Sequence, residues 1–431
     1  MVTLNDGQAN AKKGILGVIN RGKNSNVDKF VTLVGPAGCG KTFTVVEILK
    51  SLGPRVSVGL TSPTHKACAV LRQMAFTAGI ANRCDIRTIH SALGLALKQI
   101  DGAEVINRDK YVEEKIYDVL FIDECSMTDD ELLGFIIESE STTIIFVGDV
   151  AQISPVTSVS GMISKTFTEV SQVIKLTDIV RQAQGNPIIQ LATALRLCQE
   201  DPNQGWPKIS PHLLDDGSGV NVLNKSSWFN EAVNIFSSEE FKSNQDLCRC
   251  IAYTNKTVDM INDKIRKAIH GQDVPEYMKG ETIIAQSAGK FHKNAEEMRI
   301  MDIELIDDEV YNLSCWSMKL YSLHDDVIHN VLVLSDVSKK DYESKLNKFS
   351  ELARLDSQNK GQHWKSFWTL KNTFNDFKHI YAMSAHKSQG STIKYVYVYT
   401  PDFVKFGATM EMKQLVYTAT TRASFLTTFA Y

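Results

Sequence analysis

A glycine-rich segment, Gly35-Pro-Ala-Gly-Cys-Gly-Lys-Thr42, restricts the fold of this chain more than any other part of its sequence. It satisfies the pattern G-x-x-x-x-G-K-[ST], follows an apolar run at residues 30–34 and precedes an amphipathic stretch at residues 43–49. A strand, such a loop and a helix form a phosphate-binding loop, whose backbone N–H groups surround phosphate oxygens. The segment therefore predicts a nucleoside triphosphate site made of Gly35, Pro36, Ala37, Gly38, Cys39, Gly40, Lys41, Thr42 and Phe43.

A pair of adjacent carboxylates, Asp123 and Glu124, follows a second apolar run at residues 119–122. Alone, such a pair is usually a solvated strand end. In a chain with a phosphate-binding loop, the first carboxylate and Thr42 are suited to hold Mg²⁺, and the second is suited to accept a proton from the attacking water. The two motifs together predict hydrolysis of ATP with Mg²⁺, in which Lys41 and Glu124 are catalytic.

The first 180 residues alternate β-branched runs with amphipathic stretches, which is typical of βα units around a parallel sheet. Strands are expected at residues 30–34, 56–60, 119–122 and 143–147. The polar stretch 94–117 interrupts this alternation and contains the turn signal Asp101-Gly102, so we expect an inserted β-hairpin there.

The second half predicts another α/β core with an insertion of its own. Residues 250–266 and 395–399 have α/β character, whereas residues 280–337 alternate apolar and polar side chains as in a small antiparallel β module. An aromatic stretch at residues 364–374 follows the module. We expect the module and its helices to interrupt the second core.

The charges of the chain are nearly balanced, with 47 lysines and arginines, 50 aspartates and glutamates, and a net charge of −3. This excludes a generally basic nucleic-acid coat protein, so nucleic acid would have to be bound by local features. The N-terminus lacks the apolar stretch of a signal peptide, and the apolar runs have the length of strands. We therefore expect a cytoplasmic protein with no membrane association.

Further short segments accompany the two motifs in a fixed order from residue 4 to residue 422. They are Leu4-Asn-Asp-Gly-Gln8, Ser62-Pro-Thr-His-Lys66, Thr88-Ile-His-Ser91, Gly148-Asp-Val-Ala-Gln152, Leu176-Thr-Asp-Ile-Val-Arg181, Ala385-His-Lys-Ser-Gln-Gly-Ser-Thr392 and Val416-Tyr-Thr-Ala-Thr-Thr-Arg422. In this ordered series the chain resembles superfamily 1 helicases. The short forms TIHS and AHKSQG resemble the RecD/Dda branch, and the length of the chain is most similar to that of the phage Dda helicases.

The resemblance implies an α/β fold with two RecA-like P-loop NTPase cores and an SH3-like β module. Residues 1–185 would form the first core, with the hairpin at 94–117 as its insertion. Residues 186–270 and 376–431 would form the second core, and residues 271–375 the β module with a helical aromatic arm.

The resemblance also assigns roles at the ATP site. Gln8 resembles a glutamine that reads adenine, with a plain surface glutamine as the alternative. Gln152 resembles the sensor of the γ-phosphate, and Arg181 and Arg422 resemble two arginines directed at that phosphate. A planar guanidinium suits the charge that develops on its oxygens.

Residues on both cores match positions that contact single-stranded DNA in the family. They are Pro63, Thr64, His65, Lys66, Thr88, His90, Ser91, Tyr253, Thr254, Asn255, His386, Lys387, Ser388 and Thr392. Hydroxyls, backbone N–H groups and a few lysines hold phosphates without reading sequence. For each residue, a helix-capping hydroxyl or a core histidine is the open alternative.

The inserted hairpin departs from the resemblance. A Dda-like wedge presents an aromatic residue to the duplex, and between residues 95 and 114 this chain has only Tyr111, with Val105 and Ile106 as apolar alternatives. The aromatic stretch 364–374 is either the core of a small module or a brace between the module and the wedge.

We expect an ATP- and Mg²⁺-dependent DNA helicase that moves 5′→3′ on single-stranded DNA and opens forked duplexes in phage-type replication, recombination or repair. The alternatives are a translocase that strips proteins from DNA and an ATP-gated recruitment module; an RNA substrate also remains open. We expect a monomer that works with a single-strand-binding or replication protein, in the host cytoplasm if the chain is phage-encoded.

Overall fold

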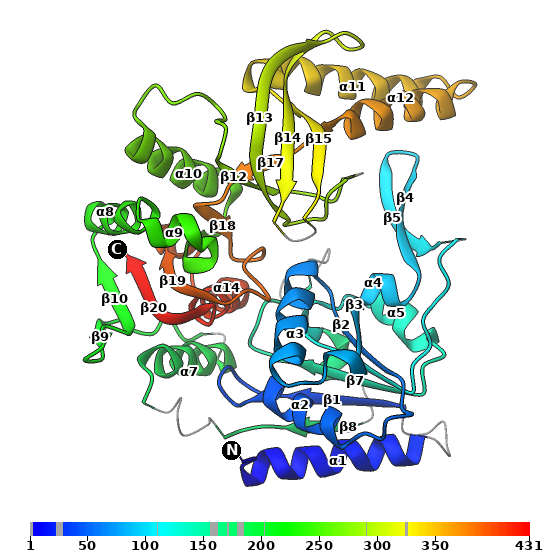
Figure 1. Ribbon diagram of the computed structural model, residues 1–431, viewed down its shortest axis with the longest axis vertical. Coiled ribbons are helices and arrows are strands. Elements are labelled where there is room, and N and C mark those ends of the chain that lie inside the picture. The colour runs from blue at the N-terminus through cyan, green and yellow to red at the C-terminus, as the bar shows by residue number, and fades with distance from the viewer. Residues whose placement is uncertain are drawn as a thin grey trace. The chain divides into compact units, whose positions relative to one another are not determined.

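The computed structural model describes residues 3–22, 29–109, 111–155, 163–169, 172–178, 185–201, 203–289, 291–323 and 326–431 (Figure 1). The chain divides into two compact units. The first consists of Met1–Leu95, Arg108–Val258 and Ala382–Tyr431, and the second consists of Ala96–Asn107 and Asp259–Tyr381.

A parallel sheet in the order β3-β2-β6-β7-β1-β8 forms one half of the first unit. Its strands are β1 (Phe30–Val34), β2 (Val58–Ser62), β3 (Asp85–Thr88), β6 (Val119–Ile122), β7 (Thr143–Gly148) and β8 (Gln172–Lys175). The four central strands are almost wholly buried, which explains their continuous apolar runs. Strand β2 begins two residues later than expected because the Val56 N–H bonds back to the Gly53 carbonyl in a turn.

Helices cover this sheet through spaced apolar side chains. The helices α1, α2 and α3 lie beside the strands of this sheet (Figure 1). Ile15 of α1, Ile48 of α2 and Leu71 of α3 belong to one buried cluster with the strands β1, β2, β6 and β7. The helical segments of this half are α1 (Asp6–Gly22), α2 (Lys41–Ser51), α3 (His65–Thr77), α4 (Ile89–Ala92), α5 (Asp130–Glu138) and the 3₁₀ turns η2 (Ala81–Arg83), η3 (Cys125–Met127) and η4 (Lys165–Phe167).

A second sheet, in the order β18-β11-β19-β20-β10-β9, forms the other half of the first unit. Its strands are β9 (His212–Leu213), β10 (Gly219–Leu223), β11 (Cys248–Ala252), β18 (Ala382–Ser384), β19 (Ile393–Val398) and β20 (Ala423–Ala430), and only β9 runs antiparallel to its neighbour. Its helical segments are α7 (Pro187–Glu200), α8 (Lys225–Phe236), α9 (Glu239–Ser243), η5 (Gln245–Leu247), the first turn of α10 (Asn255–His270), α13 (Pro401–Val404) and α14 (Met410–Thr420). The expected second α/β core is therefore present.

The core of the second sheet includes residues that follow β7 of the first sheet. Ala151 and Ile153 are 4% exposed and share one buried cluster with Leu195 of α7, Leu415 of α14 and Val396 of β19. The two sheets are thus joined by apolar packing within one unit.

The second unit contains a largely antiparallel sheet in the order β16-β15-β14-β13-β12-β17. Its strands are β12 (Thr282–Ala285), β13 (Glu297–Asp308), β14 (Leu313–Ser322), β15 (Ile328–Leu334), β16 (Phe374–Asn375) and β17 (Phe377–His379). Alternating residues such as Met318, Leu320, Val331 and Val333 face its core, as the sequence pattern predicted.

A helical arm and a hairpin complete the second unit. The arm consists of η6 (Asp336–Ser338), α11 (Lys339–Leu355) and α12 (Lys360–Thr373), and the hairpin consists of β4 (Leu95–Ile100) and β5 (Ala103–Arg108) around the predicted turn Asp101-Gly102. A Cβ atom on Gly102 would lie 2.4 Å from Cη2 of Trp364, so the turn packs directly on the indole ring of the arm. Tyr111 is 94% exposed and lies beyond the end of β5, so it is not part of the hairpin strands.

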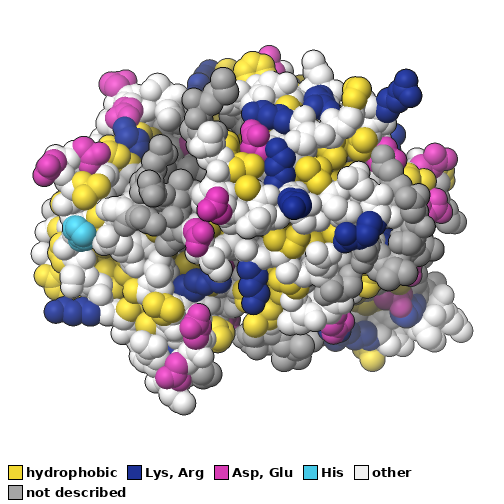
Figure 2. All heavy atoms as spheres, turned by 90° about the horizontal axis from the view of Figure 1, so that it is seen from below, with side chains coloured by type: hydrophobic (Ala, Val, Ile, Leu, Met, Phe, Trp, Pro, Cys, Tyr) yellow, Lys and Arg dark blue, Asp and Glu magenta, His cyan; other side chains and the backbone are white. Residues whose placement is uncertain are grey.

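The surface carries charges of both signs. On the face shown in Figure 2, lysines and arginines lie among aspartates and glutamates, as the near balance of 47 against 50 predicts. Within the described ranges, each helix is too short or too polar to cross a membrane.

A buried ion pair in the second unit generates a first prediction. Arg266 Nε lies 2.6 Å from Glu281 Oε1 and Nη2 lies 2.9 Å from Oε2, and both side chains are less than a tenth exposed. Removing one partner leaves a buried charge uncompensated, which costs about 3–5 kcal/mol. We expect Arg266→Met to lower the free energy of unfolding of this unit by that amount, measured as faster amide hydrogen exchange in β12 and β13.

The matched control is Lys319→Met, which removes an exposed pair with Asp302 in the same unit. Its effect should stay below about 1 kcal/mol because water screens the pair. Equal exchange rates in the two variants would show that the buried pair contributes no more to the free energy of unfolding than the exposed pair, and would contradict the prediction.

Candidate active site and nucleic-acid interface

The phosphate-binding loop runs from the end of β1 to the start of α2, as the motif predicted. Gly40 has φ 80° and precedes Lys41, the first residue of α2, so the chain enters the helix through a left-handed glycine. The ammonium of Lys41 donates to the carbonyls of Gly35 and Pro36 at 2.6 and 3.1 Å. Thr42 lies exposed in the first turn of α2, where helix N–H groups favour an anion.

The acidic pair lies at the same edge of the sheet as this loop. Asp123 and Glu124 follow β6, and β7 lies between β6 and β1. Because parallel strands end at one edge, the carboxylates and the loop share that edge. Burial, and then the charge of Glu124, raise the pKa of Asp123 well above its usual range. A cation that binds beside Asp123 would relieve this desolvation.

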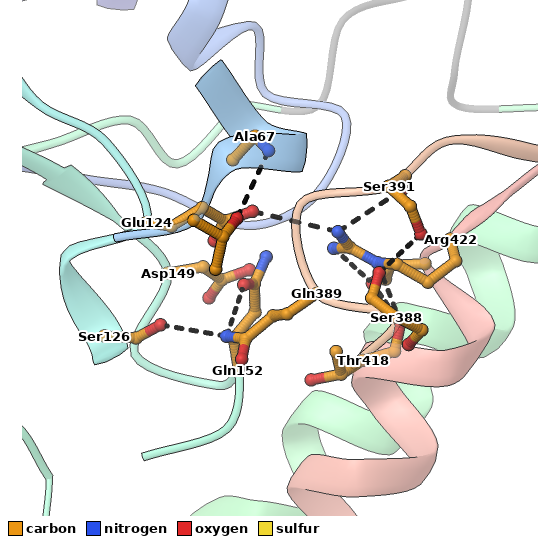
Figure 3. Close-up of polar contacts among 12 residues, drawn as sticks. Ala67, Glu124, Ser126, Asp149, Gln152, Ser388, Gln389, Ser391, Thr418 and Arg422 are labelled. Atoms are coloured by element: carbon orange, nitrogen blue, oxygen red, sulfur yellow. Dashed lines mark hydrogen bonds and ion pairs between the residues drawn. The ribbon is translucent and has the colours of Figure 1, made fainter. Parts of the chain in front are cut away.

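Arg422 brings a cation from the second sheet to this acidic pair. Its Nη1 lies 3.7 Å from Oε1 of Glu124, and Figure 3 shows the guanidinium extended toward the carboxylate. Glu124 has φ 54°, a left-handed conformation that is strained for a side chain with a Cβ atom. The strand end thus holds Glu124 in an uncommon conformation next to Arg422. Arg181, the other predicted arginine, lies outside the described residues.

A glutamine of the second core contacts two groups of the first. Gln389 Nε2 lies 3.4 Å from Oε1 of Gln152 and 3.4 Å from Oγ of Ser126 (Figure 3). Gln152 is 6% exposed, so its amide is buried among polar groups from both sheets. The predicted sensor is therefore placed against the second core, and the contact through Gln389 was not predicted from the sequence.

Gln8 is buried against the phosphate-binding loop. It is 3% exposed, its Nε2 donates to the carbonyl of Cys39 at 3.1 Å, and its Oε1 accepts from the Asn5 N–H at 3.1 Å. The alternative of a plain surface glutamine is therefore wrong, while the contact with adenine stays a prediction.

Three further residues near the site were not singled out from the sequence. Asp149 is fully buried; its Oδ1 lies 3.0 Å from Nη1 of Arg196, and its Oδ2 accepts from the hydroxyl of Tyr417 at 2.5 Å. Asp149 and Tyr417 lie inside two of the ordered segments, which was the available signal. Arg196 lies in an ordinary amphipathic helix, and nothing in its sequence surroundings indicates this contact.

The candidate DNA residues of the first sheet follow two neighbouring strands. Ser62 and Thr88 are paired across β2 and β3, so the segments 63–66 and 88–91 leave the sheet side by side. Thr64 and Thr88 both act as N-caps, accepting from the N–H groups of Ala67 and Ser91. The capping alternative therefore applies to both threonines, although capping leaves part of each hydroxyl available.

The other residues of these two segments surround the helix starts. Pro63 and His65 are half-buried, and Lys66 lies 3.4 Å from Asp246. Ser91 is exposed, and burial lowers the pKa of the partly buried His90.

Tyr253 and Thr254, at the end of β11, are organised by Asp402. The Asp402 carboxylate accepts from both N–H groups and from the Thr254 hydroxyl at 2.9, 2.7 and 3.1 Å. Burial raises the pKa of Asp402, but the ammonium of Lys405 and the donors around the carboxylate, including these two N–H groups, lower that pKa below its ordinary value. Thr254 is thus engaged structurally, whereas Asn255 next to it is exposed.

The segment 385–392 carries the remaining candidates. The His386 ring lies 6.3 Å from that of Tyr253, and Lys387 is half-buried beside it. Ser388 differs from the expectation of a DNA contact: it is fully buried and its hydroxyl donates to the Ala385 carbonyl at 2.8 Å. Thr392 is exposed.

The two sheets bring their candidate DNA segments into contact. Gly390 has φ 73°, and a Cβ atom built on it would lie 2.8 Å from Cβ of Ala67 in α3. The segment 385–392 therefore lies directly against the start of α3, which carries Thr64, His65 and Lys66. Residues from both sheets form one continuous candidate interface beside the contact of Arg422 with Glu124.

Comparison with known proteins supports this organisation. Residues 3–206 match the family model described as an AAA domain, residues 276–379 match the Dda helicase SH3 domain, and residues 379–426 match the UvrD-like helicase C-terminal domain. The chain is 28% identical to the ATP-dependent DNA helicase dda of Enterobacteria phage T4, over 98% of each chain. It is 33% identical to the ATP-dependent RecD2 DNA helicase of Deinococcus radiodurans over 44% of this chain and 25% of that protein.

A solved structure shares the fold at low sequence identity. A structure described as showing DNA unwinding at forked duplex DNA by two coordinating Pif1 helicases aligns with a TM-score of 0.51 and 15% identity. The alignment covers 99% of this chain and 92% of the Pif1 chain. Two RecA-like sheets with an SH3-like module, the ordered segments and the full-length similarity to the phage protein agree: the chain is similar to the Dda-like helicases of superfamily 1B.

Proposed function

We propose that this chain is an ATP-dependent DNA helicase that moves 5′→3′ along single-stranded DNA and opens forked duplexes. One observation supports the proposal most strongly: the same two sheets contact each other both at the ATP site and at the candidate DNA interface. Arg422 reaches Glu124 beside the phosphate-binding loop, and Gly390 touches Ala67 at the candidate DNA interface. Because both contacts join the same two sheets, a relative movement of the sheets would change both contacts together. The phage T4 and Deinococcus relatives are both named ATP-dependent DNA helicases, which supports the same function.

The residues of the first core suit ATP hydrolysis. Lys41 is held at the mouth of the loop by two carbonyls and would transfer its hydrogen bonds to phosphate oxygens. Glu124 lies at a strand end where it would take a proton from the attacking water. Gln152 would position that water, and Arg422 and Arg181 would stabilise charge on the γ-phosphate.

The donor set around Asp123 fits Mg²⁺. An exposed hydroxyl of Thr42 and a partly buried carboxylate of Asp123 are hard oxygen donors, the kind that Mg²⁺ prefers together with substrate phosphates. The ion, when bound, would neutralise phosphate charge. Thr42 and Asp123 would orient it, and Glu124 would remain free for the proton.

Coupling to DNA follows from the shared segments. Segment 385–392 carries Gln389, which contacts Gln152, and Gly390, which contacts Ala67. A shift of this segment during hydrolysis would change the grip of the two candidate DNA surfaces on phosphates. Unequal grip through the cycle makes motion directional.

The hairpin and the arm suit strand separation. Besides the contact of Gly102 with Trp364, Lys360 lies 2.7 Å from Asp101, and the amides of Gln99 and Asn372 exchange two hydrogen bonds at 3.2 Å. The arm thus holds the hairpin at its turn. A hairpin held in this way would present its exposed apolar side chains, Leu97, Ile100 and Val105, to a duplex.

The wider setting is part of the proposal. We place the first core at residues 1–185 with the hairpin at 94–117, the second core at 186–270 and 376–431, and the β module at 271–375. We propose a monomer that acts in phage-type replication, recombination or repair, in the host cytoplasm and with a single-strand-binding or replication protein. The full-length similarity to a phage helicase supports the phage setting.

Paired forked substrates test the function directly. Duplexes with either a 5′ or a 3′ single-stranded tail, in DNA and RNA versions, are incubated with and without ATP. We expect ATP-dependent strand separation of the 5′-tailed DNA. Unwinding from 3′ tails would contradict the direction, and ATP hydrolysis without unwinding would favour a translocase.

Glu124→Gln separates nucleotide binding from hydrolysis. The amide keeps the size of the side chain but cannot accept the proton, so kcat for ATP should fall about 10²–10⁴-fold with nucleotide binding retained. Lys41→Ala should lose both ATP hydrolysis and DNA unwinding. Turnover of Glu124→Gln near the wild-type rate would refute its role as base.

Trp364→Ala tests the brace on the hairpin. The substitution removes the ring on which Gly102 packs, so the hairpin keeps the polar contacts of Asp101 and Gln99 with the arm but is held less firmly. The unwinding rate should fall about tenfold while ATP hydrolysis stimulated by single strands stays within about twofold. Val310→Ala, which trims a 78% exposed side chain in the same unit, is the control and should change neither rate.

A further inference from the structure

The hydroxyl of Tyr417 connects three segments of the first unit. It donates to Oδ2 of Asp149 at 2.5 Å and accepts from the N–H of Ala37, in the phosphate-binding loop, at 3.2 Å. Tyr417 is 1% exposed and lies on α14 of the second core. One atom thus joins the loop, the segment after β7 and α14.

The direction of these hydrogen bonds is set by the surroundings. Burial, and then the charge of Asp149, raise the pKa of Tyr417 well above its ordinary value, so the hydroxyl keeps its proton. That proton goes to the carboxylate, which leaves a lone pair for the Ala37 N–H. Asp149 also accepts from Arg196 at 3.0 Å and from the Ala151 N–H at 3.1 Å.

Other contacts attach the segment after β7 to the second core without reaching the loop. Gln199 donates to the Ala151 carbonyl at 3.1 Å, and the Gln414 amide lies 3.2 Å from the Ser154 hydroxyl. These contacts hold the segment to α7 and α14. The hydroxyl of Tyr417 extends the attachment to Ala37.

Arg422 follows shortly after Tyr417 in the chain, just beyond the end of α14. The Nε of Arg422 donates to the Thr418 carbonyl at 3.2 Å. This hydrogen bond fixes the Arg422 side chain to the last turn of α14, the helix that carries Tyr417. The place of the last turn of α14 relative to the loop therefore decides where the guanidinium lies relative to Lys41.

We infer that Tyr417 is a positioning residue that ties the phosphate-binding loop to α14 and thereby sets the register of Arg422 on the γ-phosphate. The inference rests on the proposed ATP hydrolysis. It assigns Tyr417 no contact with the nucleotide. We expect the loop amides after Ala37 to stay in place without the Tyr417 hydroxyl, which bonds to the Ala37 N–H, so ATP binding and hydrolysis should respond differently to its loss.

Tyr417→Phe isolates the hydroxyl because it keeps the buried ring. We expect KM for ATP to stay within about twofold, whereas kcat for hydrolysis stimulated by single-stranded DNA falls about tenfold, or ~1.4 kcal/mol in the barrier. Both constants are measured per folded molecule, with the folded fraction taken from thermal unfolding.

Two hydroxyl deletions serve as matched controls. Tyr397→Phe removes the hydroxyl of another buried tyrosine in the second core, 3.5 Å from Glu231 and on a different element. Ser154→Ala removes a hydroxyl that attaches the segment after β7 to α14 but is not bonded to the loop. Both should keep kcat within about twofold of the wild type.

The outcomes separate the inference from the proposed function. An unchanged kcat in Tyr417→Phe, a rise in KM alone, or an equal loss in Ser154→Ala would overturn the role of Tyr417 and leave the helicase assignment intact. Wild-type hydrolysis that ignores DNA would count against the helicase assignment. In that case Tyr417→Phe should show the same tenfold loss in kcat for ATP hydrolysis without DNA, so the role of Tyr417 can still be tested.

Discussion

A carboxylate removed from water needs charged or hydrogen-bonded partners, and Asp149 finds them on two helices of the second core. Arg196 of α7 and Tyr417 of α14 bind its two oxygens, while Asp149 itself follows β7 of the first sheet. An unpaired carboxylate at this depth would cost several kcal/mol, so the second core must meet the first at this point. The contacts of Arg422 and Gln389 with the first core depend on that meeting.

The sequence predicts those parts of the site in which the required residues are adjacent in the chain. The phosphate-binding loop needs a strand, glycines with positive φ and a helix start, all within a short stretch, and α2 begins at Lys41 as expected. The carboxylate pair follows a fully buried strand in the same way. The four central strands of the first sheet match the predicted apolar runs to within two residues because burial on both faces produces continuous apolar runs. The edge strands β3 and β8 were not predicted, since they are only partly buried and lack such runs.

Contacts between distant segments were not predictable in the same way. Nothing near Gln389 indicates that its amide meets Gln152 and Ser126. The brace between the aromatic stretch and the hairpin was one of two alternatives taken from the resemblance, and the sequence did not show that Gly102 is the residue that packs on Trp364. Ser388 shows that not every residue of a matching motif can contact a ligand. Its neighbours His386 and Lys387 are partly exposed, whereas its own hydroxyl donates to the backbone carbonyl of Ala385 inside the protein. A motif indicates which segment matters, whereas burial decides which of its side chains can reach a ligand.

The cations of the site, Lys41 and Arg422, are already paired with groups of the protein. Nucleotide binding would therefore replace these contacts with contacts to phosphate. A triphosphate must take Lys41 from the carbonyls of Gly35 and Pro36, so part of its attraction is offset by bonds that are lost. Arg422 likewise must leave Glu124 to reach a phosphate. That departure frees the carboxylate that would accept the proton. Because a single movement both engages the arginine and releases the base, hydrolysis would wait until the second core has closed on the nucleotide.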